Sequence, residues 1–341
     1  MISEVGIEVI RARLDAEDRV AHVAVLSGDE IGSVSITASS VAVPSRGRFL
    51  LYSITKTIMA VSALRLVQGG RLDLGQPLSS WLPEFPPARE FSLRHILQHT
   101  SGLPDYGGLK HYHDAVRRGD VPWTEDEFLA QTDATRLRAA PGSAFEYSNV
   151  GYMLLRRVLR RASGQDFASL LHRTVFAPAG IDDATVPATR DDLSAFTFGP
   201  SHYLGGDGEP VDVAQRYDPA WIAHGVVGTS VASAARFLHA LLCGQLLAAP
   251  LLSEMAKSRA LETHDGGDLW QHPAYGLGLM TAWDQARGGP GLGHRGGGPG
   301  CSPAVFHFPR KKRPLTVCVI TNGEDSDLPV AMVKAVADTF S

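Results

Sequence analysis

Ser53 and Lys56 are the residues whose types and spacing point most directly to chemistry. A serine hydroxyl is a weak nucleophile and needs a neighbouring group that accepts its proton. Residues three positions apart share one face of a helix, so the amine of Lys56 can reach the hydroxyl of Ser53. This spacing also arises by chance in many chains. It predicts a lysine-activated serine nucleophile only together with the motifs that follow it.

The segment around Ser53 predicts a helix that begins at the serine. An apolar, strand-like run at residues 49–52 leads into it, and Gly69 with Gly70 ends it. The apolar residues in between recur at helical spacing: Ile58, Met59, Leu64 and Val67. The free N–H groups and the positive dipole end at a helix start favour developing negative charge. A nucleophile at this position therefore gains electrostatic support.

Tyr147 and Asn149 form a second candidate motif. Pro141 and Gly142 mark a turn, and the apolar run from Val150 starts a helix, so Tyr147 is expected on a loop. A phenol can pass a proton on if a nearby cation lowers its pKa, and an asparagine can donate a hydrogen bond to a substrate carbonyl. The alternative is structural: Tyr147 packs under the loop and Asn149 caps the next helix.

A glycine-rich segment at residues 293–300 is the third candidate. Five glycines in eight residues leave the backbone open to close approach by a ligand, as an oxyanion hole of N–H groups requires. The alternative is a flexible hairpin loop. Residues 304–308 and 315–320 favour two adjacent strands joined by the basic turn 309–314. The glycines are then expected to line the edge of a sheet.

With these three motifs in this order, the chain resembles the serine β-lactamase and penicillin-binding-protein superfamily. The likeness is greater to its class C-like branch, which includes family VIII carboxylesterases, D-aminopeptidases and DD-carboxypeptidase-like hydrolases. The motifs are Ser53 to Lys56, Tyr147 to Asn149, and His294 to Gly296 in the position of the lactamase K-T-G; residues 93–106 and 141–152 also resemble that branch. The histidine in place of lysine is common in its esterase and peptidase members, which weakens the case for a dedicated β-lactamase.

The resemblance implies a mechanism through an acyl-enzyme. Ser53 attacks a carbonyl while Lys56, helped by Tyr147, accepts its proton, and the N–H groups of Ser53 and Gly297 hold the oxyanion. Tyr147, tuned by His294, then protonates the leaving group. Either Lys56 or Tyr147 could be the base, since such coupled groups share their titration. The residues expected around the substrate are Asn149, Tyr106, Arg295, Gly296 and Gly298.

Arg295 has two interpretations. A guanidinium suits a carboxylate, so it could bind an acidic substrate. Side chains alternate along a strand, so it could instead point away from His294 and pair with a structural acid. Cys301 is expected to be a small buried residue.

The resemblance also implies the fold class: α/β (α+β), β-lactamase/transpeptidase-like, with an antiparallel sheet flanked by helices and an inserted, mostly helical domain. Residues 1–65 and 220–341 are assigned to the α/β domain and residues 66–219 to the helical one. The active site is expected in the groove where the two meet.

Composition limits the partners. A net charge of -4 gives no reason to expect nucleic acid, and no apolar stretch of about 18 residues predicts a membrane span. Residues 1–13 predict an amphipathic helix. They lack the basic region followed by an apolar core that a signal peptide has, so a signal peptide is not expected here. Three cysteines without metal spacing suit a reducing compartment, so a cytoplasmic location is expected.

No cofactor or metal is expected. Residues 111–114 (His-Tyr-His-Asp) could suggest a metal cluster, but no second cluster accompanies them, and an exposed loop is expected there. The expected partner is a small ester, amide or lactam, and the sequence favours no oligomeric state. An intracellular esterase or amidase is the first hypothesis, a β-lactamase or D-amino-acid peptidase the second, and a catalytically silent binding module the third.

Overall fold

The computed structural model describes residues 2–14, 19–37, 47–206, 208–261, 273–282, 291–309, 311 and 313–340. In this part of the chain, an antiparallel sheet has the strand order β2-β1-β10-β9-β8-β7-β6-β5. Both chain ends supply its strands. They are β1 (Val20–Ser27), β2 (Glu30–Thr37), β5 (Arg259–Ala260), β6 (Ala274–Tyr275), β7 (Met280–Ala282), β8 (Gly291–Arg295), β9 (Ser302–Phe308) and β10 (Leu315–Thr321).

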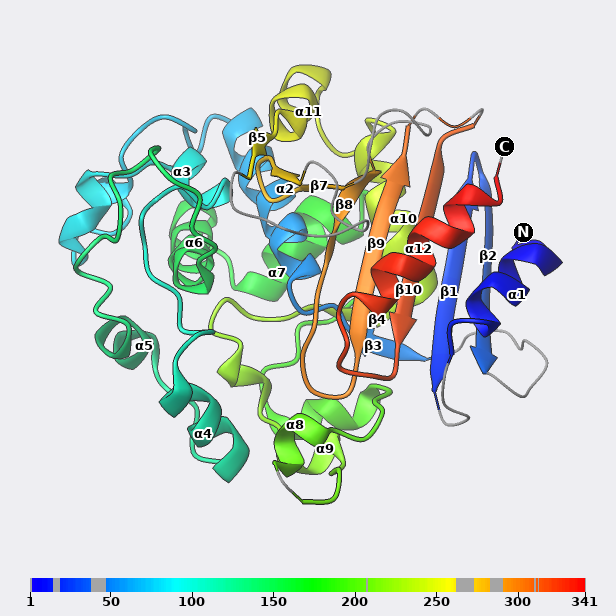
Figure 1. Cartoon of the computed structure of the whole chain (residues 1–341). Coiled ribbons are helices and arrows are strands. Elements are labelled where there is room, and N and C mark those ends of the chain that lie inside the picture. Colours follow the sequence, from blue (N-terminus) through cyan, green and yellow to red (C-terminus); the bar gives the residue numbers. More distant parts are fainter. Residues whose placement is uncertain are drawn as a thin grey trace.

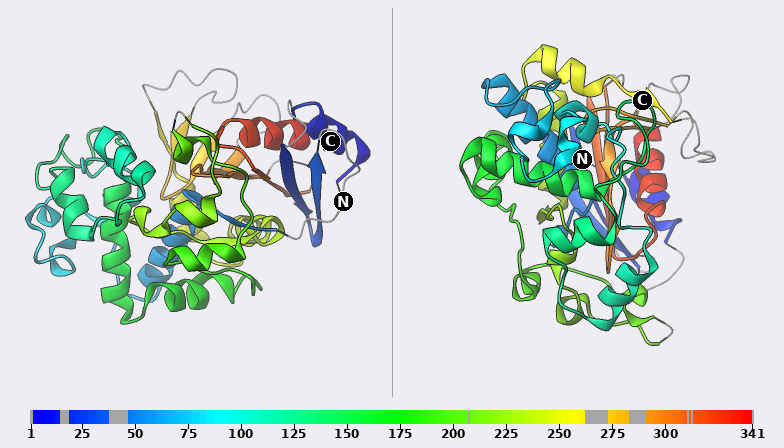
Figure 2. Two further views of the ribbon diagram at one scale, coloured as in Figure 1. Left: turned by 90° about the horizontal axis from the view of Figure 1, so that it is seen from below. Right: turned by 90° about the vertical axis from the view of Figure 1, so that its left-hand side faces the viewer.

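Helices cover both faces of this sheet. The helices α1 (Glu4–Arg11) and α12 (Leu328–Asp338) pack on one face, and α10 (Val231–Leu242) packs on the other (Figures 1 and 2). The period-two pattern of a strand explains both layers. Val23 of β1 faces the hydrophobic cluster that includes α12, whereas its neighbour Ala24 faces the cluster that includes α10. The expected N-terminal helix is therefore confirmed as one part of this layer.

The expected pair of strands near the C-terminus is confirmed, but the place expected for the glycines is wrong. Strands β9 and β10 pair antiparallel, with Val305 opposite Cys318. Strand β8 lies between β9 and β7 instead of at the edge of the sheet. The glycines from Gly296 onward form the connection from β8 to β9. Gly296 there lies against Leu51 and Ser53, just before the helix that begins at Ile54.

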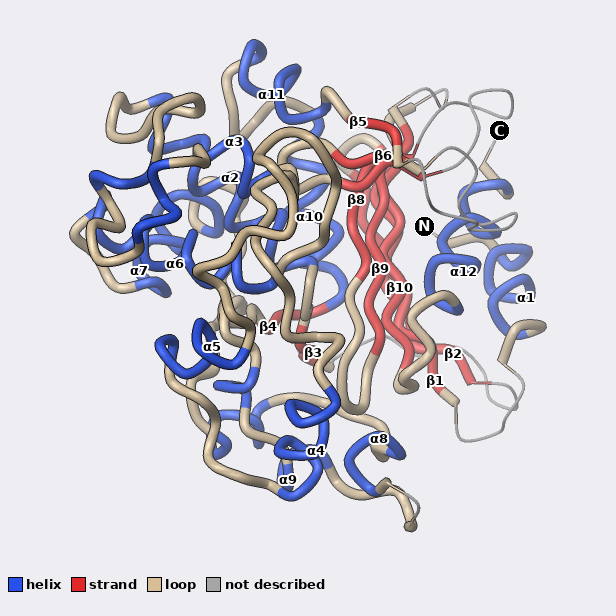
Figure 3. Tube along the Cα trace, turned by 60° about the vertical axis from the view of Figure 1, so that its left-hand side comes forward, coloured by secondary structure: helices blue, strands red, loops and turns tan. Residues whose placement is uncertain are grey.

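A second group of elements comes from the middle of the chain and lies beside the sheet (Figures 1 and 3). Its α-helices are α3 (Leu93–Leu97), α4 (Lys110–Arg118), α5 (Glu125–Gln131), α6 (Asn149–Ser163), α7 (Phe167–Leu171), α8 (His202–Gly205) and α9 (Val213–Arg216). The π-helix is η3 (His172–Phe176), and the 3-10 helices are η1 (Leu78–Ser80), η2 (Pro86–Arg89), η4 (Arg190–Ala195) and η5 (Pro219–Trp221). Residues 111–114 belong to α4, so the loop expected there is wrong; the alternation of polar and buried positions along α4 is helical.

Helix α2 (Ile54–Gln68) joins the two groups of elements. It begins after Ser53 and ends at Gly69, which confirms the predicted helix. It is buried over most of its circumference, because it contacts β8 on one side and α6 on the other. The remaining elements near it are the two-stranded sheet β3 (Arg48–Leu50) and β4 (Gly228–Ser230), and α11 (Ala249–Ala256). Among the described residues, no helix combines the length and the apolar character that crossing a membrane requires.

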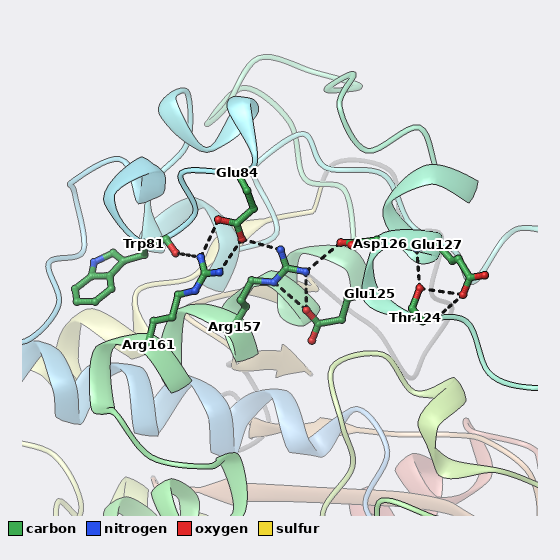
Figure 4. Close-up of polar contacts among 8 residues, drawn as sticks. All are labelled: Trp81, Glu84, Thr124, Glu125, Asp126, Glu127, Arg157 and Arg161. Carbon is green, nitrogen blue, oxygen red and sulfur yellow. Dashed lines mark hydrogen bonds and ion pairs between the residues drawn. The ribbon is translucent and has the colours of Figure 1, made fainter.

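Ion pairs attach α6 to its surroundings (Figure 4). Arg157 of α6 lies 2.8 Å from Glu84 and 2.7 Å from Glu125 of α5, and Arg161 lies 2.9 Å from Glu84. Exposed ion pairs stabilise little singly, but the Arg157 side chain is only 15% exposed and takes part in a network. The network fixes the helix whose first residue is Asn149.

Candidate active site

Ser53 lies at the junction between the strand β3 and the helix α2. It is partly exposed, between the buried residues Tyr52 and Ile54. Tyr52 has a φ angle of 43°, a left-handed conformation that is uncommon for a bulky residue. Its hydroxyl donates a hydrogen bond of 2.6 Å to the carbonyl of Pro299. This strained residue turns the chain sharply, so that the Ser53 side chain emerges at the start of the helix.

Lys56 is fully buried one turn along the helix. Its Nζ lies 3.2 Å from Oγ of Ser53, 2.6 Å from Oδ1 of Asn149 and 3.3 Å from Nε2 of His224. Burial lowers the pKa of Lys56 to about 7, although the charge of Asp105 acts in the opposite direction. Near neutral pH a large share of this amine is therefore uncharged and able to accept a proton.

Asn149 is held between two charged groups. Its Oδ1 accepts the hydrogen bond from Lys56, while its backbone N–H and its Nδ2 donate to Asp105 at 2.8 and 3.3 Å. An amide nitrogen carries two hydrogens, so one remains for a ligand in the cavity that Asn149 lines. The structural alternative, in which Asn149 caps α6, is wrong, because the side chain of Ser148 caps this helix.

Tyr147 lies on the loop before α6, as predicted, and lines the larger of two cavities that both reach Ser53. The Nζ atom of Lys56 lies 4.9 Å from the centre of its ring. A lowered pKa was the condition for proton transfer through this phenol, but burial raises the pKa of Tyr147 well above its usual value. In the free protein Tyr147 is thus a neutral hydroxyl, which can donate its proton and is a poor base.

His99 positions the Tyr147 loop, and sequence reasoning did not single it out. Its ring lies 4.2 Å from the ring of Tyr147, centre to centre, and its Nδ1 accepts a hydrogen bond from the N–H of Ser148. Its carbonyl accepts another from the N–H of Glu146. His99 also has a left-handed φ angle of 54°. It lies in the stretch 93–106 on which the resemblance partly depended, and this was the only signal.

His294 is a buried, neutral histidine. A carbonyl can only accept, so Nδ1 donates to the carbonyl of Arg295 at 2.6 Å, and Nε2 accepts from the hydroxyl of Tyr275 at 3.0 Å. Burial lowers the pKa of His294 to about 3, against the effect of the bond to Arg295. Both ring nitrogens of His294 are thus engaged by Arg295 and Tyr275. We expected His294 to adjust the pKa of Tyr147, but neither of these hydrogen bonds joins the two residues.

The glycines were expected to let a ligand approach the backbone closely. At Gly296 and Gly298, other residues of the protein occupy that space instead. A Cβ on Gly296 would lie 2.6 Å from the carbonyl of Leu51, and a Cβ on Gly298 would lie 2.2 Å from the Tyr52 ring. The N–H of Gly296 donates to the carbonyl of Pro303. For Ser53 and Gly297, no hydrogen bond from the N–H is recorded with any described residue, so both donors are available to an oxyanion.

Two cavities meet at Ser53. One has a volume of about 330 Å³ and the other about 460 Å³, and both are lined by Ser53, Gly297 and Glu324. Asn149 and Gly298 line the smaller cavity, whereas Tyr147, His294 and Gly296 line the larger one. The structure therefore brings the sequence-predicted residues to one site with two sides.

Tyr106 and Arg295 reach this site with some of their polar groups already engaged. Tyr106 lines the smaller cavity, and its hydroxyl accepts a hydrogen bond from the N–H of Ala223 at 3.2 Å. Arg295 lines the larger cavity, while its guanidinium bonds to Asp327 and to Ser326. Sequence reasoning had not identified three further residues of the site: His224, Asp105 and Glu324.

The chain is similar to curated proteins over part of its length. It is 33% identical to the esterase EstB of Burkholderia gladioli over 180 residues, which are 49% of this chain and 44% of EstB. It is 33% identical to penicillin-binding protein 4* of Bacillus subtilis over 143 residues, which are 40% of this chain and 30% of that protein. The matches thus span less than half of the length of these relatives.

Solved structures share the fold over nearly the whole chain. A D-stereospecific amidohydrolase from Streptomyces sp. superposes with a TM-score of 0.79 at 23% identity, covering 96% of this chain and 97% of the other. A D-amino acid amidase from Ochrobactrum anthropi SV3 gives a TM-score of 0.79 at 24% identity, covering 98% and 97%. The predicted fold class is confirmed. The model of the family described as Beta-lactamase matches residues 13–339. The resemblance seen in the motifs is thereby confirmed, and the chain belongs to the beta-lactamase family.

Proposed function

We propose that this protein is a serine hydrolase that cleaves a small ester or amide through an acyl-enzyme on Ser53. One observation carries the proposal: Nζ of Lys56, whose pKa burial lowers to about 7, lies 3.2 Å from Oγ of Ser53. A base with a pKa near the working pH and within hydrogen-bond reach is the best acceptor for the serine proton. Of the two candidates for the base, Lys56 has the lowered pKa and Tyr147 the raised one, so the proposal assigns this role to Lys56.

Acylation then proceeds by proton transfer and attack. Ser53 Oγ bonds to the substrate carbonyl carbon as its proton moves to Lys56. The carbonyl oxygen becomes negative and receives hydrogen bonds from the N–H groups of Ser53 and Gly297. The hydroxyl of Tyr147, which lines the larger cavity together with Ser53, relays the proton to the leaving alcohol or amine. Water then releases the acid and restores Ser53.

The family supports this class of reaction, and its members differ in substrate. The relatives and structural neighbours include a protein named as an esterase, penicillin-binding proteins and an amidase. An esterase or amidase is the first proposal because His294 is neutral and supplies no cation for an acidic substrate. A β-lactamase or a D-amino-acid peptidase is the alternative. A catalytically silent binding module is disfavoured by the intact contact between Lys56 and Ser53. We assign the protein to the cytoplasm within this proposal, since its described cysteines are free thiols.

Intact-mass analysis tests the proposal. The protein is incubated with 4-nitrophenyl esters, D-amino acid amides and benzylpenicillin, and a covalent adduct is mapped by peptide analysis. The expected adduct has the mass of the acyl group and lies on Ser53. Ser53→Ala should lose the adduct, hydrolysis and fluorophosphonate labelling while it keeps its thermal midpoint. Ser194→Ala, at an exposed serine whose hydroxyl bonds to a nearby carbonyl, is the matched control and should lose nothing. Undiminished labelling of Ser53→Ala would overturn the assignment.

A further inference from the structure

The smaller cavity at Ser53 is walled by tyrosine rings. Five tyrosines line it: Tyr52, Tyr106, Tyr112, Tyr203 and Tyr217. The hydroxyls of Tyr52 and Tyr112 donate to the carbonyls of Pro299 and Trp221. The hydroxyl of Tyr106 accepts from the N–H of Ala223, and that of Tyr203 pairs with Nδ1 of His113. Because these four hydroxyls are engaged inside the protein, their tyrosines offer the cavity mainly their rings.

One acidic side chain lines this cavity, while the guanidinium of Arg117 already lies 4.9 Å from the centre of the Tyr203 ring. Glu324 is the only Asp, Glu, Lys or Arg among the described residues that line it. Its carboxylate accepts hydrogen bonds from the hydroxyl of Ser201, the N–H of Gly300 and the N–H of Tyr203. An ionised carboxylate has about four acceptor positions, so three donors leave one open. No ion pair joins Glu324 to a cation in the described parts of the chain.

Aromatic rings with a carboxylate bind organic cations. The face of a tyrosine ring attracts an ammonium group, and a partly desolvated site strengthens this attraction. A half-buried carboxylate without a counter-charge gains most from a ligand that supplies one. A neutral apolar ligand would use the rings and leave Glu324 uncompensated. An acidic ligand would meet it as a like charge.

The proton donor indicates which part of the substrate enters this cavity. Tyr147 lines the larger cavity and not the smaller one. A general acid must lie next to the atom that it protonates, so the leaving group belongs in the larger cavity. The acyl part stays bonded to Ser53 Oγ after the leaving group has taken the proton. It therefore lies in the smaller cavity, which the tyrosines line.

We propose that the tyrosine cavity binds a positively charged amine on the acyl part of the substrate, so that the preferred substrates are esters or amides of amine-bearing carboxylic acids. This rests on the proposed hydrolase function. In the reaction, the bond from Ser53 Oγ to the acyl carbon forms and the bond from that carbon to the leaving oxygen or nitrogen breaks. Water later hydrolyses the acyl-enzyme and gives the amine-bearing acid.

Two esters of equal shape and different charge test the proposal. They are 4-nitrophenyl 4-(trimethylammonio)butanoate and 4-nitrophenyl 5,5-dimethylhexanoate, in which carbon replaces the charged nitrogen. After division by the rate of each ester with hydroxide, kcat/KM should favour the cationic ester by at least about tenfold, as expected for cation binding by rings and a carboxylate. Glu324→Gln should bring this ratio below about threefold by slowing the cationic ester alone. Asp325→Asn removes a neighbouring charge outside both cavities and should leave the ratio unchanged.

The outcomes separate the two proposals. If both esters acylate Ser53 with equal corrected rates, the cation site is overturned and the hydrolase stands. If Glu324→Gln slows both esters equally, Glu324 only holds Ser201, Tyr203 and Gly300 through its hydrogen bonds, and the cation site is again overturned. If neither these esters nor any compound of the earlier panel acylates Ser53, the hydrolase proposal fails. The cation site is then decided by calorimetric titration of Ser53→Ala with the two corresponding amides. Tighter binding of the cationic amide supports the site and equal binding refutes it. If Glu324→Gln does not fold, the same calorimetric comparison of the two amides decides whether the cation site exists.

Discussion

Nε2 of His224 lies 3.3 Å from Nζ of Lys56, so the buried amine is next to a histidine as well as to Ser53 and Asn149. Burial, and then the charge of Lys56, hold the pKa of His224 well below its usual value. The ring is therefore neutral, and its Nε2 can accept a hydrogen bond from the lysine. Such a bond stabilises the charged form of Lys56 and opposes the effect of burial on its pKa.

The rate of acylation should rise with pH through about 7. Below the pKa of Lys56, which burial lowers to about 7, the lysine is protonated and cannot accept the proton of Ser53. Above it the amine is free, so the rate should increase about tenfold per pH unit below pH 7 and level off above it. Single-turnover release of nitrophenol, read at its isosbestic wavelength, measures this. Lys56→Ala should lower the plateau rate above pH 7 by at least about 100-fold. A flat profile for the native protein would exclude Lys56 as the base.

Replacing His224 should move that profile. His224→Leu keeps the site apolar and removes one acceptor from the lysine ammonium, so the apparent pKa should fall below that of the native protein. The plateau rate should also fall, because Lys56 loses one of the contacts that orient it. His224→Gln is the matched variant, since its side-chain oxygen can accept the same hydrogen bond and should restore most of the native profile. If both variants keep the native apparent pKa, His224 only fills space.

Local patterns in the sequence were enough for the nucleophile and its helix. The spacing of Ser53 and Lys56 acts within one helical turn, and Gly69 ends the helix at the place where the pattern stops. Strands β9 and β10 were also readable, because each is a continuous apolar run beside a short turn. These features depend on contacts between residues that are close in the chain.

The parts of the site that sequence reasoning missed depend on distant contacts. His224 is 168 positions from Lys56, and no local pattern relates the two. Asp105 meets Asn149 across 44 positions. The glycines after β8 revealed an open backbone, but they could not reveal that Tyr52 would fill the space at Gly298. The internal place of β8 in the sheet also depends on the short strand β7, which has too few residues to show an alternating pattern.

Tyr147→Phe should slow acylation by an amide by about 100-fold or more, because a general acid typically contributes about 100- to 10,000-fold. The loss should be larger for an amide than for an activated ester, since an amine leaves only with a proton whereas nitrophenolate needs none. The thermal midpoint should change little, because the ring still stacks on His99. The measurement is the pre-steady-state rate on both substrates. Near-native rates on both would return Tyr147 to a structural role.

Arg295→Ala should affect stability and not substrate charge selection. Its guanidinium bonds to Asp327 and Ser326 at the start of α12, which supports the structural interpretation. The Arg295 side chain is 25% exposed and that of Asp327 is 55% exposed, so the loss should be about 1 kcal/mol or less. Chemical denaturation of Arg295→Ala, Asp327→Ala and the double variant measures it, and the two losses should not add. A selective rise in KM for acidic esters in Arg295→Ala would instead support binding of a substrate carboxylate by Arg295.

Activated esters should be cleaved more efficiently than benzylpenicillin. The position of the lactamase lysine holds His294, and burial lowers the pKa of this histidine to about 3, so it carries no charge at neutral pH. The neighbouring Arg295 is bonded to Asp327 and Ser326, which leaves it less able to hold the penicillin carboxylate. Glu324, which lines both cavities, would also repel that carboxylate. We therefore expect kcat/KM, divided by the rate of each compound with hydroxide, to be higher for a 4-nitrophenyl ester than for benzylpenicillin. Ser53→Ala should lose both activities, which ties them to one nucleophile. A higher corrected value for benzylpenicillin would make the protein a β-lactamase.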